Sequence, residues 1–117
     1  MMGQTSVPEA VPTSLKETVE AVVATIVRGC NPHRVILFGS AANGQWTPDS
    51  DLDLLVIADS ALPRHRRAAA LRLLFDPYPC PMDILVYTPA EVQRWRDSAN
   101  HIVAEALRTG KVVYERT

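Results

Sequence analysis

The sequence has few cysteines and no excess of charge of either sign. Its two cysteines, Cys30 and Cys80, do not form a metal-ligand spacing. We expect them to be free thiols, although the sequence alone leaves a disulfide between them open. The formal net charge of −1 over 117 residues argues against a general nucleic-acid binder, which would carry a basic excess. Apolar residues make up 47% of the chain, so we expect a core that needs neither disulfides nor structural metals.

A long apolar run is also missing, since none approaches the roughly 20 residues needed to cross a bilayer. The first residues have no basic stretch followed by an apolar one, so no signal peptide is predicted. We therefore expect a cytoplasmic protein without membrane contacts. Residues 1–12 contain Pro8 and Pro12 and are predicted to form a flexible tail, and residues 13–117 are predicted to form one domain.

The remaining pattern predicts an α/β (α+β) fold with a mixed sheet and flanking helices. Ser14 and Glu17 have the spacing of a capping box and predict the start of a helix that ends before Pro32. Thr88 and Pro89 predict the start of the last helix, and Gly110 is predicted to follow its end. We expect helices over 14–30, 62–75 and 89–108, buried strands over 34–38, 52–57 and 82–87, and a short edge strand over 111–114.

Three aspartates open two of the predicted strands. Asp51 and Asp53 begin SDLDLLVI, and alternation along a strand places them on one face, roughly 7 Å apart. Asp83 begins the next strand in the same way, as PMDILVY. Grouped carboxylates repel unless a cation lies between them, and Mg²⁺ prefers oxygen ligands. The alternative is that these aspartates are strand caps or solvated turn residues, and a lone Asp-x-Asp triplet would not decide between the two.

A Gly39-Ser40 turn directly follows the first predicted strand. Glycine allows a sharp turn and a close approach to a ligand, and Ser40 offers a hydroxyl and a backbone N–H. A short helix beginning at Ala41 would also direct its N-terminus at the site. These groups suit a triphosphate, although a plain turn between a strand and a loop would look the same.

The combined spacing of Gly-Ser, ten residues and Asp-x-Asp, with a third aspartate on a later strand, resembles the DNA polymerase β-like nucleotidyltransferase superfamily. The segments TPAEV and EALRTGKVVYER make the chain similar to its minimal nucleotidyltransferases. The resemblance implies that Gly39 and Ser40 bind the nucleotide, and that Asp51, Asp53 and Asp83 are the catalytic and metal-binding residues. It implies two Mg²⁺ ions and ATP as the substrate.

The same resemblance implies a role and a partner. Minimal nucleotidyltransferases commonly act as antitoxins that adenylylate a hydroxyl of a HEPN-domain ribonuclease, so a helical HEPN-type partner and a homo- or hetero-oligomer are expected. Two alternatives stay open: a binding module that neutralises its partner by forming a complex, and a nucleotidyltransferase for small molecules of the aminoglycoside type. No direct nucleic-acid binding is expected.

The chain departs from the family pattern after Ser40, where many relatives carry arginines and this one has Ala41-Ala42-Asn43-Gly44. Weak nucleotide binding is one expected consequence, and substitution by Arg64, Arg66 or Arg67 is another. We otherwise expect these arginines to lie on a solvated helix face.

Several aromatic and histidine residues have no assigned chemistry. Trp46 is equally compatible with stacking on a base and with packing on the domain. Trp95 and Tyr114 are expected to make core or partner contacts. His33, His65 and His101 are given no catalytic role.

Overall fold

The computed structural model describes residues 14–47 and 49–117, so the expected tail over 1–12 lies outside the described residues. A four-stranded mixed sheet with the order β3-β2-β1-β4 forms the centre. Its strands are β1 (Arg34–Phe38), β2 (Leu52–Ile57), β3 (Met82–Tyr87) and β4 (Lys111–Glu115). β1 is antiparallel to both β2 and β4, whereas β2 and β3 are parallel. The sheet prediction, including the edge strand, is confirmed.

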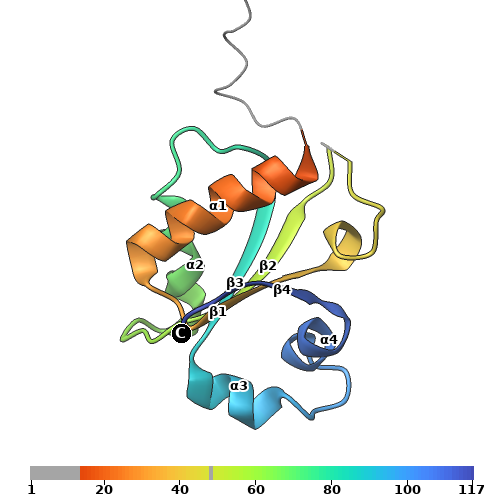
Figure 1. Cartoon of the computed structure of the whole chain (residues 1–117). Coiled ribbons are helices and arrows are strands. Elements are labelled where there is room, and N and C mark those ends of the chain that lie inside the picture. The colour runs from red at the N-terminus through yellow and green to blue at the C-terminus, as the bar shows by residue number, and fades with distance from the viewer. Residues whose placement is uncertain (1–13, 48) are drawn as a thin grey trace, which may run out of the picture.

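Two pairs of helices cover the sheet, one pair on each face (Figure 1). The helices are α1 (Leu15–Cys30), α2 (Arg64–Arg72), α3 (Pro89–Trp95) and α4 (Ile102–Thr109), and a single 3₁₀ turn, η2 (Gly39–Ala41), follows β1. None of the helices in the described part of the chain is long and apolar enough to span a membrane.

Alternation along the strands divides the core between the two faces. In β2, Leu54 is fully buried in the layer that includes Val22 and Ile26 of α1, whereas its neighbour Leu55 is fully buried in the layer that includes Val103 of α4. A strand that buries both faces has a continuous apolar run, as residues 35–38 of β1 and 54–57 of β2 do. Because Asp53 alternates in phase with Leu55, it belongs to the α3/α4 face.

Both predicted helix starts are confirmed by capping boxes. The Ser14 hydroxyl accepts a hydrogen bond from the Glu17 N–H, and Thr88 and Glu91 repeat the arrangement at α3. Asn31 ends α1 in the left-handed conformation, just before Pro32. Gly110 follows α4 as expected, but its backbone is extended. Its smallness matters instead, since a Cβ there would lie 2.5 Å from the Ala106 carbonyl oxygen.

The prediction of one helix over 89–108 is wrong. α3 ends at Trp95, and α4 begins at Ile102. Between them Asn100 has a φ of 64°, which a continuous right-handed helix cannot contain. The His101 side chain then caps α4 by accepting a hydrogen bond from the Val103 N–H at 3.1 Å. The ring of His101 stacks on Trp95, with the ring centroids 4.4 Å apart.

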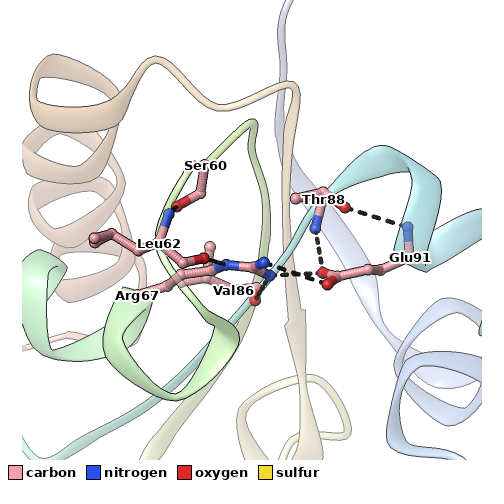
Figure 2. Close-up of polar contacts among 6 residues, drawn as sticks. All are labelled: Ser60, Leu62, Arg67, Val86, Thr88 and Glu91. Atoms are coloured by element: carbon pink, nitrogen blue, oxygen red, sulfur yellow. Dashed lines mark hydrogen bonds and ion pairs between the residues drawn. The ribbon is translucent and has the colours of Figure 1, made fainter.

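The predicted helix over 62–75 is shorter than expected, and one of its arginines is not on the solvent side. α2 covers only Arg64–Arg72, and the Arg67 side chain is 8% exposed. Its guanidinium forms a two-point ion pair with Glu91 and also donates to the carbonyl oxygens of Leu62 and Val86 (Figure 2). Arg67 therefore ties α2 to β3 and α3.

Candidate active site

Asp53 and Asp83 are direct partners in the parallel pairing of β2 and β3. Neighbouring strands lie roughly 4.8 Å apart, so the two residues lie side by side at the same edge of the sheet. Side chains of paired residues share a face, which here is the α3/α4 face. Asp51 lies just before β2 and is exposed, as is Asp83, whereas Asp53 is partly buried. The structure therefore brings Asp53 and Asp83 together, and Asp51 lies two positions before Asp53 in the chain.

Gly39 lies directly against Asp53. Its φ is +73°, a conformation that favours glycine, and a Cβ at this position would lie 2.2 Å from Oδ2 of Asp53. The contact follows from the pairing of β1 and β2, in which Phe38 is opposite Asp53. A side chain at position 39 would therefore displace the Asp53 carboxylate.

Ser40 is the second residue of η2. Its backbone carbonyl oxygen accepts hydrogen bonds from the N–H groups of Asn43 and Gln45 at 3.3 and 3.0 Å, which closes the turn. Within the described chain its hydroxyl has no hydrogen-bond partner, so it is free to bind a ligand. The expected short helix from Ala41 is absent from the described chain, because the segment makes only the single 3₁₀ turn Gly39–Ala41. This loop can therefore present a hydroxyl group and a turn to a ligand, but not the N-terminus of an α-helix.

The carboxylates influence one another electrostatically. Partial burial raises the pKa of Asp53, and the negative charges of Asp83 and then Asp51 raise it further. This repulsion is the condition that a divalent cation relieves. The donor set, three carboxylates with hard oxygen atoms, fits Mg²⁺.

The protein does not form a complete cage for such an ion by itself. Among the described residues, no three histidine, cysteine, aspartate or glutamate side chains are grouped closely enough to hold a metal ion. Mg²⁺ commonly keeps several waters and takes only one or two carboxylates, the rest coming from substrate phosphates. The arrangement therefore fits a cation that is held jointly with a nucleotide.

Two of the three arginines suggested as replacement phosphate ligands are held elsewhere. The Arg64 guanidinium lies 5.3 Å from the ring centroid of Tyr87, at the opposite end of β3 from Asp83. Arg67 is paired with Glu91. This prediction is therefore wrong for Arg64 and Arg67, and Arg66 is exposed on the same short helix.

Trp46 packs on the α1/α2 layer, the face opposite to Asp53. Its indole Nε1 is buried and has no hydrogen-bond partner among the described residues. Trp46 therefore packs on the domain, as one of the two interpretations predicted, and it does not lie where it could stack on a base at the carboxylates.

Cys80 is a neighbour of the site that sequence reasoning missed. Burial raises the pKa of its thiol, and the nearby negative charge of Asp51 raises it further. Its position three residues before Asp83 was the only available signal. Both cysteines are free thiols, as expected.

A profile of the nucleotidyltransferase domain family matches residues 19–115, which include β1, the Gly39-Ser40 turn and all three aspartates. The chain belongs to this family. No curated protein matches the sequence of this nucleotidyltransferase domain.

Two solved structures resemble the nucleotidyltransferase domain in fold. One is a Sulfolobus solfataricus protein assigned as a nucleotidyltransferase, with a TM-score of 0.59 and 18% identity over 87% of this chain and 80% of that one. The other belongs to a toxin–antitoxin structure with AMP-PNP, with a TM-score of 0.57 and 21% identity over 84% of this chain and 74% of that one. At these identities the likeness shows the fold alone.

Proposed function

We propose that this domain is a Mg²⁺-dependent nucleotidyltransferase that moves AMP from ATP to a hydroxyl group of a partner protein, and so acts as the antitoxin of a HEPN-type ribonuclease. The observation that carries the proposal is the side-by-side placement of Asp53 and Asp83, with the backbone of Gly39 against Asp53. Paired carboxylates can hold the metal ions of a phosphoryl displacement, and the turn and the Ser40 hydroxyl can contact phosphate oxygens.

In the proposed reaction, the acceptor hydroxyl oxygen forms a bond to the α-phosphorus of ATP. The bond from that phosphorus to the bridging oxygen breaks, and pyrophosphate leaves. Asp83, which is exposed, takes the hydroxyl proton. Asp51, Asp53 and Asp83 would share the Mg²⁺ ions with the phosphates of ATP, so that no single ion needs all three carboxylates, and the ions would supply charge neutralisation at the phosphates.

Gly39 and Ser40 would position the triphosphate. Close approach of the phosphates is possible because position 39 has no side chain, and the Ser40 hydroxyl is free to donate to a phosphate oxygen. Few cations assist them, since η2 is followed by Ala42, Asn43 and Gly44. We therefore expect weak binding of ATP in the absence of the acceptor.

The partner proposal is supported by similarity in fold to a chain from a toxin–antitoxin structure with AMP-PNP. A protein acceptor also suits the exposure of Asp51 and Asp83, because both carboxylates can be reached by a residue on another molecule. In the cell, modification of the ribonuclease would silence it.

The test is transfer of label from [α-³²P]ATP to the product of the adjacent gene, with and without Mg²⁺. Asp53→Asn should abolish labelling. Asp49→Asn, the same chemical change at an exposed turn residue, is the matched control and should label normally. No label on the partner under any of these conditions would refute the proposed reaction.

A second function is favoured by one specific observation: the loop after Ser40 lacks cations, and Arg64 and Arg67 are held elsewhere. In this second function, the domain would neutralise its partner by forming a complex with it, without nucleotidyl transfer. Asp53→Asn would then still protect cells from the ribonuclease. Protection that disappears while the complex persists would rule this function out.

A further inference from the structure

A hollow of about 400 Å³ lies at the other end of the sheet from the aspartates. Along β2 it is reached at Ile57, four residues beyond Asp53 and therefore roughly 13 Å away. Ile57, Pro89 and Val92 supply apolar lining. Its volume lies within the range of about 300 to 1,000 Å³ that is typical of small-molecule sites. The hollow is therefore separate from the carboxylate site and large enough for a ligand.

Three arginines line the same hollow, and within residues 14–47 and 49–117 only one of them forms an ion pair with a carboxylate. Arg34 forms an ion pair with Glu115 at 2.8 Å. Arg96 is exposed and has no side-chain partner within the described residues. Arg116 donates to a carbonyl oxygen and to a histidine but contacts no carboxylate there. Among the described residues, Arg96 and Arg116 are therefore the guanidiniums of the hollow without a carboxylate partner, and Asp59 is connected to it only through His33.

Arg116 is fixed before any ligand arrives. Its Nη2 donates to Nδ1 of His33 at 2.7 Å, and its Nη1 donates to the carbonyl oxygen of Asn31 at 3.3 Å. Because Nδ1 accepts this hydrogen bond, Nε2 of His33 carries the hydrogen that is donated to Asp59 at 3.0 Å. The backbone N–H of Arg116 also donates to the His33 carbonyl oxygen at 2.9 Å. A guanidinium held in this way loses less freedom on binding an anion.

We propose that this hollow binds a small organic phosphate, with the phosphate group on Arg96 and Arg116 and a flat apolar body on Ile57 and Val92. The two unneutralised guanidiniums match the charge of a phosphate monoester, and each can donate two hydrogen bonds to its oxygens. Single-stranded nucleic acid is recognised by a track of cations with successive aromatic platforms. The hollow offers one compact cationic group and an aliphatic floor, which favours a single small molecule.

The test uses AMP as the probe and the methyl NMR signals of Ile57 and Val92 as the readout, in EDTA so that no divalent cation is present. AMP should shift these signals with saturable binding, adenosine should not, and inorganic phosphate should bind more weakly than AMP. Arg96→Ala should weaken AMP binding about tenfold, the equivalent of one charge-assisted hydrogen bond. Because Arg96 is exposed and unpaired among the described residues, its removal should leave the fold intact.

Two variants serve as controls. Arg66→Ala removes another exposed guanidinium that does not line the hollow and should leave AMP binding unchanged. Asp53→Asn should also leave it unchanged, which separates this site from the proposed reaction. Binding of adenosine alone, phosphate binding as tight as that of AMP, equal affinity in the Arg96→Ala variant, or an RNA oligonucleotide that binds more tightly than AMP would each overturn the proposal.

Discussion

Replacing Glu91 by glutamine should destabilise the domain more than replacing its partner Arg67 by methionine. The Arg67 side chain is 8% exposed and that of Glu91 is 28% exposed, so the arginine is the member of the pair that water cannot reach. Glu91→Gln leaves that buried positive charge without a counter-ion. Arg67→Met leaves a carboxylate that can still be hydrated.

The magnitude follows from the contacts. Oε1 of Glu91 accepts from Nη1 of Arg67 at 2.6 Å and from the Thr88 N–H at 2.9 Å. Breaking a fully buried pair costs about 3–5 kcal/mol. Because Glu91 is partly hydrated and glutamine keeps one acceptor, we expect a loss of about 2 kcal/mol for Glu91→Gln, and about 1 kcal/mol for Arg67→Met.

The effect of Glu91 should also depend on pH. The hydrogen bond from Arg67 lowers the pKa of Glu91 below its ordinary value of 4.5. A carboxyl group whose pKa is lowered by folding stabilises the folded state above its unfolded pKa, and this stabilisation is lost as the pH falls through the folded pKa. The difference between the parent protein and Glu91→Gln should therefore be full at pH 7 and shrink below about pH 4.5.

Urea unfolding followed by circular dichroism measures these differences. With a slope of about 1.5 kcal/mol per M, Glu91→Gln should lower the midpoint at pH 7 by about 1.3 M. Glu105→Gln, the same change at an exposed position on α4, should leave the midpoint nearly unchanged. An Arg67→Met variant less stable than Glu91→Gln, or a Glu91→Gln effect equally large at pH 7 and pH 3, would refute the reasoning.

Four further predictions concern the site and the sheet. Gly39→Ala should reduce nucleotidyl transfer at least a hundredfold in the labelling assay, roughly 3 kcal/mol, because the new Cβ displaces the Asp53 carboxylate; a fully active variant would contradict the proposed role of that contact. Because the pKa of Asp53 is raised, its charge costs stability as the pH rises through the folded pKa, so Asp53→Asn should raise the melting temperature at pH 7 without metal. Mg²⁺ at about a hundred times its Kd should stabilise the parent by about 2.7 kcal/mol in the same melting experiment and Asp53→Asn by less; an equal gain would argue against Asp53 as a ligand. Gly110→Ala should cost at least 2 kcal/mol in urea unfolding, because its Cβ would meet the Ala106 carbonyl oxygen and the Ile36 side chain; a midpoint equal to that of the parent would show that the helix can shift.

Features encoded by neighbouring residues were predictable. The three buried strands follow from short apolar runs, and the starts of α1 and α3 follow from the spacing of Ser14 with Glu17 and from Thr88 before Pro89. The break between α3 and α4 was also indicated by nearby residues, namely the turn-forming residues around Asn100. It was missed because the apolar positions on both sides continue a helical pattern.

Features that depend on distant partners could not be predicted. Arg67 is buried because Glu91, 24 positions away, neutralises it, and no pattern near Arg67 indicates this. The contact of His33 with Arg116 spans 83 positions. For the candidate site, the sequence predicted the carboxylates and the turn, but the pairing of Asp53 with Asp83 and the contact of Gly39 with Asp53 required the sheet register.

The parallel register of β2 and β3 makes the carboxylate pair a sensitive indicator of correct strand alignment. If β3 shifted its register against β2 by one residue, the Asp83 side chain would point into the apolar core beneath α1 and α2. Ile84 would then take its place beside Asp53. Such a misaligned molecule would hide a charge and expose an aliphatic side chain, so it would be both inactive and unstable. Loss of the proposed transfer activity would therefore be one expected sign of a shifted β3 register.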